Sequence, residues 1–243
     1  MAFSRKKKRT SSPSADAALA ILIDGDDQVA RTVTDVSFQT RSGLERVNVF
    51  LDGEYAFSLA ADIGVGLQQG QVLDAPAIRE LLDRDQGERA YQHALHFLAA
   101  RPRSTAEIRR RLTQHGHGPE AIAVALERLS HHGYADDRAF AEYWVGQRQT
   151  FHPRGPRALR AELRQKGVDA ETTTAALEPT VAGQEDAAYR AALKRAQRAP
   201  LDERAFTQTL SSFLVRRGFD YSVVRVAVHR LWGERSGAAA TEE

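Results

Sequence analysis

A repeat of 51 residues constrains the fold of this chain more than any other feature of its sequence. An apolar residue, a second one four positions later and a glycine four positions after that recur at this spacing. The three sets are Ile108, Leu159 and Leu210; Leu112, Leu163 and Leu214; and Gly116, Gly167 and Gly218. Apolar residues four apart share one face of a helix, and a glycine past its end caps the helix in the left-handed conformation. The spacing therefore predicts three homologous helices.

Each repeat has room for three helices, because glycine, proline and capping residues interrupt the helical periodicity from about residue 88 onward. Ser104 and Glu107 have the spacing of a capping box at the start of one of these helices. The helices are expected over about 88–101, 105–115 and 119–132; from 138, 156 and 170; and over 186–198, 203–217 and 221–232, with Gly233 ending the last. So small a unit buries little surface alone, and stacked neighbours must supply the rest. The prediction is a mainly α fold: an elongated, curved array of three tandem three-helix repeats.

The segment before the repeats alternates apolar and polar residues as β-strands do. Strands are expected over 33–38, 46–51 and 54–59, with Val47, Val49 and Leu51 on one face. Asp52-Gly53 between the last two is a strong hairpin signal, because glycine tolerates positive φ. A short helix and turn over 60–70 and a further helix from Asp74 complete a small, β-hairpin-containing N-terminal module.

The chain therefore divides into six parts. They are a disordered basic tail over 1–31, the β/α module over 32–87, three-helix repeats over 88–136, 137–184 and 185–234, and a disordered tail over 235–243. The longest apolar run near the start, Ala17–Ile23, is far shorter than the roughly 20 residues that span a bilayer. The chain has no cysteine, which excludes disulfides and thiolate zinc sites.

Basic residues are concentrated in the repeats. Residues 32–87 carry 4 basic and 9 acidic side chains, whereas residues 88–233 carry 23 basic and 16 acidic ones. All of these 23 basic residues are arginines except two lysines. Arginine forks suit phosphate and carboxylate recognition. The candidate binding residues are Arg101, Arg103, Arg109, Arg110, Arg154, Arg157, Arg160, Arg164, Lys166, Lys194, Arg195, Arg198, Arg216 and Arg217. Stacked repeats would align several of them into a stripe that fits a phosphate backbone or an acidic filament groove. The alternative is a solvated face, partly neutralised by Glu107, Glu162 and Asp202.

Motifs of catalysis and metal binding do not occur in the sequence. It contains no P-loop, no G-x-S-x-G elbow and no H-E-x-x-H pair. Asp136-Asp137 is expected to cap a helix, and His115-x-His117 and His131-His132 to lie at helix ends. We therefore expect no enzymatic activity, no cofactor and no metal. The aromatic residues of the repeats are expected in the core rather than as stacking platforms; they are Tyr91, Phe97, Phe140, Tyr143, Trp144, Phe206, Phe213 and Trp232.

The ordered motifs of the chain resemble the RecX family of bacterial recombinase regulators. The residues that carry the resemblance are Arg-Pro-Arg-Ser at 101–104, Glu-Ile-Arg-Arg-Arg-Leu at 107–112, Gly-Tyr-Ala-Asp-Asp at 133–137, Leu-Arg-Ala-Glu-Leu at 159–163 and Lys-Gly-Val at 166–168. Residues 46–57 resemble the additional module of longer family members. The resemblance spans roughly 32–233, and the third repeat departs most.

This resemblance implies a function that the spacing itself does not. Family members bind the RecA recombinase and its filament on single-stranded DNA, and modulate strand exchange, ATP hydrolysis and the co-protease activity of the SOS response. They are cytoplasmic and are not enzymes. The implied function is a regulator of recombination and DNA repair, with inhibition the expected effect and a monomer the expected state. Its partners are the RecA filament and single- or double-stranded DNA, with no membrane. The alternative is a general nucleic-acid-binding helical module without recombinase contact.

Overall fold

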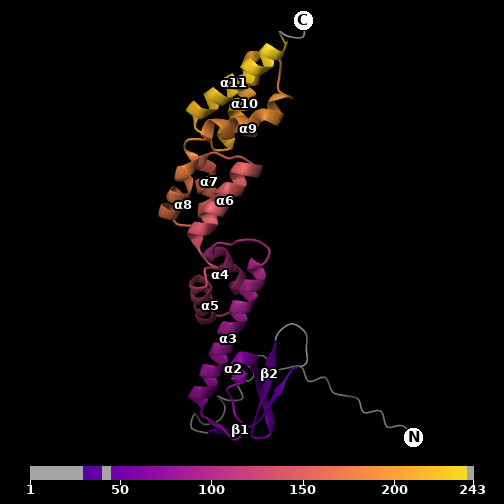
Figure 1. Ribbon diagram of the computed structural model, residues 1–243, viewed down its shortest axis with the longest axis vertical. Coiled ribbons are helices and arrows are strands. Elements are labelled where there is room, and N and C mark those ends of the chain that lie inside the picture. Colours follow the sequence, from indigo (N-terminus) through magenta and orange to yellow (C-terminus); the bar gives the residue numbers. More distant parts are fainter. Residues whose placement is uncertain (1–29, 40–44, 240–243) are drawn as a thin grey trace, which may run out of the picture. The chain divides into compact units, whose positions relative to one another are not determined.

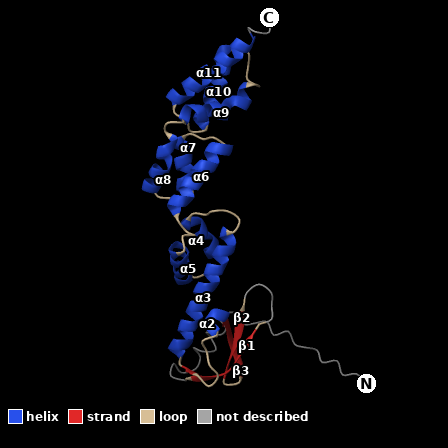
Figure 2. Cartoon of the chain, in the orientation of Figure 1, coloured by secondary structure: helices blue, strands red, loops and turns tan. Residues whose placement is uncertain are grey.

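The computed structural model describes residues 30–39 and 45–239 of the 243-residue chain, which are mainly helical (Figures 1 and 2). Within them lie ten α-helices and a four-stranded sheet, which confirms the predicted mainly α fold with a small strand module. The described residues form two compact units: those up to 95 together with 112–128, and 96–111 together with 129–239. Most of the predicted N-terminal tail lies outside the described residues.

The sheet belongs to the first unit and is antiparallel, in the order β3-β2-β1-β4. Its strands are β1 (Arg31–Phe38), β2 (Arg46–Leu51), β3 (Glu54–Ala60) and β4 (Val72–Leu73). The predicted hairpin turn is confirmed, since Asp52 and Gly53 have φ of 53° and 87°. Strand β4 was not predicted, because two residues are too short to show an alternation; it pairs with the first two residues of β1.

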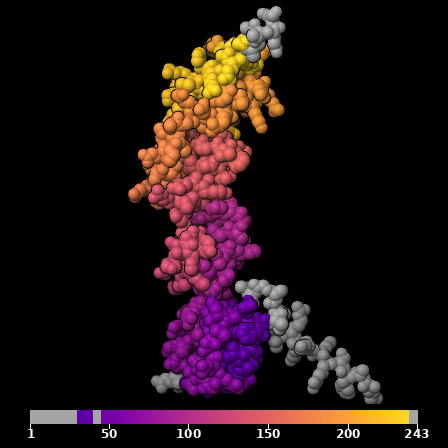
Figure 3. Space-filling model, in the orientation of Figure 1, coloured from indigo at the N-terminus to yellow at the C-terminus, as the bar shows by residue number. Residues whose placement is uncertain are grey.

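One face of this sheet is the core of the N-terminal module. Val47 and Val49 are fully buried and Leu51 is 3% exposed, as predicted, beside the short helix α2 (Ala61–Gly64) and the start of α3 (Ala75–Leu98). The indigo strands and the purple start of α3 form one packed mass in Figure 3. The buried carboxylate of Asp85 on α3 accepts a hydrogen bond from the Ala60 amide at 2.7 Å, and so ties helix to sheet.

Helix α3 is longer than predicted. The helix expected from Asp74 and the helix expected over 88–101 are one continuous element, which crosses the predicted module boundary at residue 87. Gly87 does not break it, because a helical glycine costs only about 1 kcal/mol relative to alanine. Its missing side chain makes room for Val124, whose Cγ1 would lie 3.1 Å from an added Cβ. The glycine therefore permits close packing within one continuous helix.

The later helices start and end within a few residues of the predicted limits, with one exception. They are α4 (Thr105–Gln114), α5 (Pro119–His131), α6 (Asp137–Phe151), α7 (Pro156–Gln165), α8 (Ala170–Leu177) with the 3-10 turn Glu178–Thr180, α9 (Gln184–Ala196), α10 (Glu203–Arg216) and α11 (Tyr221–Ala239). Helix α11 continues through Gly233, which was expected to end it. Residues 235–239, predicted as disordered tail, are therefore helical.

The 51-residue repeat is confirmed position by position. All six repeated apolar residues are fully buried: Ile108, Leu112, Leu159, Leu163, Leu210 and Leu214. Gly116, Gly167 and Gly218 have φ of 81°, 80° and 84°. The amide that follows each glycine donates to the carbonyl five residues earlier, at 3.1–3.2 Å, which is the Schellman geometry. Only glycine adopts this conformation without strain, so the spacing in the sequence directly records three equivalent helix ends.

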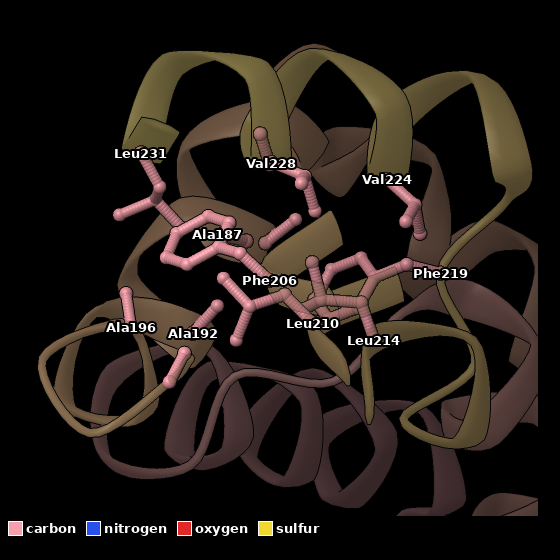
Figure 4. Packing of buried hydrophobic residues seen from close by; sticks show 13 residues of the cluster. Ala187, Ala192, Ala196, Phe206, Leu210, Leu214, Phe219, Val224, Val228 and Leu231 are labelled. Carbon is pink, nitrogen blue, oxygen red and sulfur yellow. The ribbon is translucent and has the colours of Figure 1, made fainter. Parts of the chain in front are cut away.

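Each of the last two repeats has its own apolar core. In the third, Phe206, Leu210 and Leu214 of α10 point between α9 and α11, where alanines of α9 allow the helices to approach (Figure 4). In the second, Phe140, Leu159 and Leu163 fill the equivalent place. Three of the eight aromatic residues expected in the core are buried: Tyr91, Phe140 and Phe206. The other five are only partly buried: Phe97, Tyr143, Trp144, Phe213 and Trp232.

Candidate functional site

Two of the fourteen candidate cations neutralise Glu107 in the first turn of α4. Arg101 Nη2 and Lys166 Nζ lie 3.0 Å and 2.6 Å from Glu107 Oε1. The predicted capping box is also confirmed: the Glu107 amide donates to Ser104 Oγ at 3.1 Å, and the Ser104 amide donates to Glu107 Oε2 at 3.3 Å. Burial alone would raise the pKa of Glu107, but hydrogen bonds from Arg101 and Lys166 lower that pKa to about 2. Arg101 and Lys166 are therefore charges that the fold uses internally.

A second acidic residue, Glu162 on α7, holds another candidate. Arg154 Nη1 lies 2.9 Å from Glu162 Oε1 in an ion pair that lacks hydrogen-bond geometry. Arg148 Nε and Trp144 Nε1 both donate to Glu162 Oε2 at 2.8 Å. Neither Arg148 nor Trp144 was predicted to take part. Glu107 and Glu162 thus neutralise arginines as the alternative reading anticipated.

Asp202, the third acid of that reading, has another role. Its carboxylate accepts a hydrogen bond from the Ala205 amide at 2.8 Å and caps α10. Arg217, at the far end of α10, donates from Nη1 to the Pro153 carbonyl at 3.1 Å. Burial lowers the pKa of Arg217, and the nearby charge of Arg154 lowers it further. Arg217 is therefore a structural contact between the second and third repeats.

Six candidates are exposed on the second helices of the repeats. They are Arg109 and Arg110 on α4, Arg157, Arg160 and Arg164 on α7, and Arg216 on α10. The three on α7 recur at three and four positions and so share one helix face, as predicted. No carboxylate in the described part of the chain forms an ion pair with any of these three. The equivalent positions in α10 are Gln208, Ser211 and Val215, so this cationic face does not recur in the third repeat.

Three further candidates surround a surface pocket in the third repeat. Lys194 and Arg195 of α9, Arg198 just after that helix and Thr209 of α10 line a hollow of about 420 Å³. The Arg195 guanidinium also lies 5.1 Å from the centre of the Phe213 ring. Cations in the last turn of a helix favourably meet its exposed carbonyls, which accounts for part of this clustering.

The last candidate, Arg103, stacks on an aromatic ring. Its guanidinium carbon lies 4.1 Å from the centre of the Phe97 ring, and that of Arg111 lies 5.5 Å from the same centre. Burial lowers the pKa of Arg103, as does the charge of Arg101, against the opposing effect of Glu107. Phe97 and Arg111 were not predicted as site residues. The repeat register contained a signal for them, because Phe97, Arg103 and Arg111 align with Arg148, Arg154 and Glu162.

The aspartates and histidines that were weighed as catalytic or metal-binding residues make contacts within the fold. Asp136 caps α6 as expected, accepting from two amides, while Asp137 accepts from the Thr105 amide at 2.8 Å. His93 Nδ1 lies 3.1 Å from His117 Nε2, and burial together with neighbouring charges lowers the pKa of His117. Among residues 30–39 and 45–239, no group of three or more potential ligands is arranged to hold a metal ion. In the same segments, no helix is long and apolar enough to cross a membrane.

Comparison with known proteins places the chain in a family. Residues 31–74 match the regulatory protein RecX N-terminal domain, 90–129 the first three-helix domain of RecX and 136–177 the second. The chain is 34% identical over 216 residues to the regulatory protein RecX of Bacillus licheniformis, an alignment that covers 86% of this chain and 81% of that protein. It is 33% identical over 206 residues to that of Bacillus subtilis, covering 82% and 76%.

Solved structures agree with these matches. The crystal structure of a regulatory protein RecX is 28% identical in sequence and superposes with a TM-score of 0.67 over 81% of this chain and 98% of that one. A RecX from Lactobacillus salivarius, at 21% identity, shares the fold with a TM-score of 0.54 over 61% of this chain. The chain is therefore a member of the RecX family of regulatory proteins.

Proposed function

We propose that this chain is a non-enzymatic regulator of recombination and DNA repair that binds the RecA recombinase and its filament on single-stranded DNA. Binding would inhibit ATP hydrolysis, strand exchange and the co-protease activity of the filament. Membership of the RecX family supports a regulatory role. The observation that carries the proposal is the cationic face of α7, where Arg157, Arg160 and Arg164 are exposed without a carboxylate partner in the described chain.

The chemistry of that face suits a filament of protein and DNA. Three guanidiniums spaced by three and four positions lie within one helix face and present several fork-shaped donors to phosphates or carboxylates. Arg109 is the one basic residue at the equivalent positions of the other two repeats, so we expect the second repeat, with α4 of the first, to make the principal contact. The proposal places the chain in the cytoplasm, with its partner, as a monomer.

A titration of recombinase ATPase activity on single-stranded DNA tests the function directly. We expect the rate of ATP hydrolysis to fall as the chain is added. An unchanged rate in molar excess, with strand exchange also unchanged, would contradict the proposal. Tight binding to bare DNA in the same preparation would then favour a general nucleic-acid-binding module.

The cationic face is tested by reversing its charge. Replacing Arg157, Arg160 and Arg164 together by Glu should abolish most of the inhibition while the helical circular dichroism stays unchanged. The matched control replaces Arg138, Arg190 and Arg204 by Glu; these arginines are also exposed, lie outside the candidate set and undergo the same change of charge. If both triple variants lose inhibition equally, net charge matters and the face on α7 does not.

A further inference from the structure

Arg103 lacks an ion-pair partner that its counterpart in the next repeat possesses. In the second repeat, Arg154 and Arg148 share the carboxylate of Glu162. The three positions 51 residues earlier hold Arg103, Phe97 and Arg111. The acidic member of the cluster is thus replaced by an arginine, and a flanking arginine is replaced by an aromatic ring.

The first-repeat cluster is consequently short of negative charge. The Nε of Arg103 is buried and has no hydrogen-bond partner. No ion pair joins Arg103 or Arg111 to a carboxylate of the described chain, and Glu107 nearby is already shared by Arg101 and Lys166. Burying part of a guanidinium without a compensating anion costs free energy. The first repeat therefore has room for an anion from outside at the place where the fold supplies Glu162 in the second.

The Phe97 ring gives this cluster a defined geometry. The guanidinium carbons of Arg103 and Arg111 lie 4.1 Å and 5.5 Å from the ring centre, within the range of cation–π contacts. Stacking holds two like charges near each other and leaves their N–H groups to be satisfied by an external acceptor. Arg103 also lies two residues before α4, whose amino-terminal end carries a partial positive charge.

We infer that Arg103 and Arg111, held by Phe97, form a binding site for the backbone phosphates of DNA. A single carboxylate compensates two cations at Glu162 and at Glu107, whereas this cluster has a third cation nearby. A nucleic-acid strand presents successive phosphates, and Arg110, exposed on the same helix, adds a further cation for it. This inference deepens the proposed function, on which its role at the filament rests, and assigns the contact to DNA.

The test uses bare oligothymidylate carrying a fluorescent label, without recombinase, and measures affinity by anisotropy across a series of salt concentrations. Replacing Arg103 by Gln should weaken binding roughly tenfold, because a charge-assisted hydrogen bond is lost. It should also reduce the slope of log affinity against log salt by about 0.7, the value for one phosphate contact on a single strand. Arg111→Gln should act in the same direction, and its exposed position keeps the test independent of any folding defect in the first variant.

A sharper variant recreates the second-repeat arrangement. Arg111→Glu places a carboxylate beside Arg103, which should close the site and weaken DNA binding more than Arg111→Gln while leaving thermal stability intact. The control is Arg138→Glu, an equal change of charge at an exposed arginine that pairs with Glu142. It should lower affinity only slightly.

The outcomes separate the inference from the proposed function. Equal affinities and salt slopes for Arg103→Gln, Arg111→Glu and the Arg138 control would overturn the phosphate site. So would a wild-type chain that does not bind bare DNA, or a defect in filament binding without a defect on DNA, which would assign the cluster to a protein partner. An inert wild type in the ATPase titration, with the salt slopes as expected, would instead contradict only the recombinase role.

Discussion

The joint between the first and second repeats has a side-chain hydrogen bond where the joint between the second and third has a backbone one, although the Arg217 side chain also contacts Pro153 at the second joint. In both, the end of one repeat's second helix docks on the start of the preceding repeat's second helix. At the first joint, Ser104 Oγ donates to the Lys166 carbonyl at 2.5 Å. At the second, the Gly155 amide donates to the Arg217 carbonyl at 2.9 Å. The two pairs occupy equivalent positions of the repeat. The same carbonyl position is therefore bound by a side-chain hydroxyl at the first joint and by a backbone amide at the second.

At each joint, the glycine that ends the docking helix lies against the preceding repeat. A Cβ on Gly167 would meet the Ala106 side chain at 2.3 Å, and one on Gly218 would meet the Ala158 amide at 2.4 Å. At the first joint, Glu107 adds its ion pair with Lys166 across the contact. We therefore expect the stability of both joints to depend on side-chain volume at these glycines, and that of the first joint to depend also on charge and pH.

The largest expected effect is a steric one at the second joint. A Cβ on Gly155 would lie 2.2 Å from the Gly218 carbonyl oxygen, a backbone atom that cannot move aside alone. Gly155→Ala should lower the free energy of unfolding by about 3 kcal/mol, in the range of overpacked sites. Urea denaturation followed by circular dichroism measures it.

Gly146→Ala is the matched control for that substitution. Gly146 lies within α6, and an added Cβ there meets no atom within 4 Å. Alanine should stabilise the helix by about 0.5–1 kcal/mol. If both glycine variants behave alike, the second joint is not sterically determined and the contrast between the joints is lost.

Charge removal at the first joint should have the next largest effect. Glu107→Gln leaves Arg101 and Lys166 without their carboxylate and should cost about 2 kcal/mol of unfolding free energy. Glu142→Gln removes an exposed ion pair with Arg138 and should cost less than about 0.5 kcal/mol. Equal losses in these two variants would show that the first joint does not depend on its ion cluster.

The last expected effect is the pH dependence of the same joint. Hydrogen bonds from Arg101 and Lys166 hold the pKa of Glu107 at about 2 in the folded chain, against 4.5 for the ordinary group. The unfolded chain therefore binds this proton first as the pH falls, and the stabilisation is complete above 4.5 and is lost as the pH falls toward 2. The difference in unfolding free energy between the wild type and Glu107→Gln should shrink over this interval. A difference that stays constant from neutral pH to 2 would contradict the lowered pKa.

Local signals in the sequence predicted the parts of the fold that depend on few neighbouring residues. The Asp52-Gly53 hairpin and the capping box of Ser104 and Glu107 were predicted because their hydrogen bonds close within a few residues. Local signals failed where a distant partner decided the outcome. The predicted boundary at residue 87 lies inside α3, where Val124 packs against Gly87. Gly233 also lies inside α11, but an added Cβ there would meet no atom within 4 Å, so packing does not account for it.

The candidate site shows the same division. The sequence indicated which cations to consider and, through the helical period, that Arg157, Arg160 and Arg164 share a face. It named Glu107 and Glu162 as neutralising acids but did not indicate which cations they hold; these include Arg154, eight residues from Glu162, and Lys166, 59 residues from Glu107. Ion pairing depends on distances of a few ångströms, which only the packed chain defines.

The sequence by itself determined the number of helical repeats, their length and the glycine-capped end of each repeat's second helix, since periodicity and glycine conformation are properties of the local backbone. The tertiary structure alone decided which arginines are structural and which remain open to a partner. It did so because a guanidinium's charge is compensated or left uncompensated by whatever carboxylate the fold brings beside it. Arg154 and Arg103 occupy equivalent positions in successive repeats. Arg154 is paired because Glu162 lies beside it, whereas Arg103 has Arg111 at the equivalent position and no carboxylate partner in the described chain.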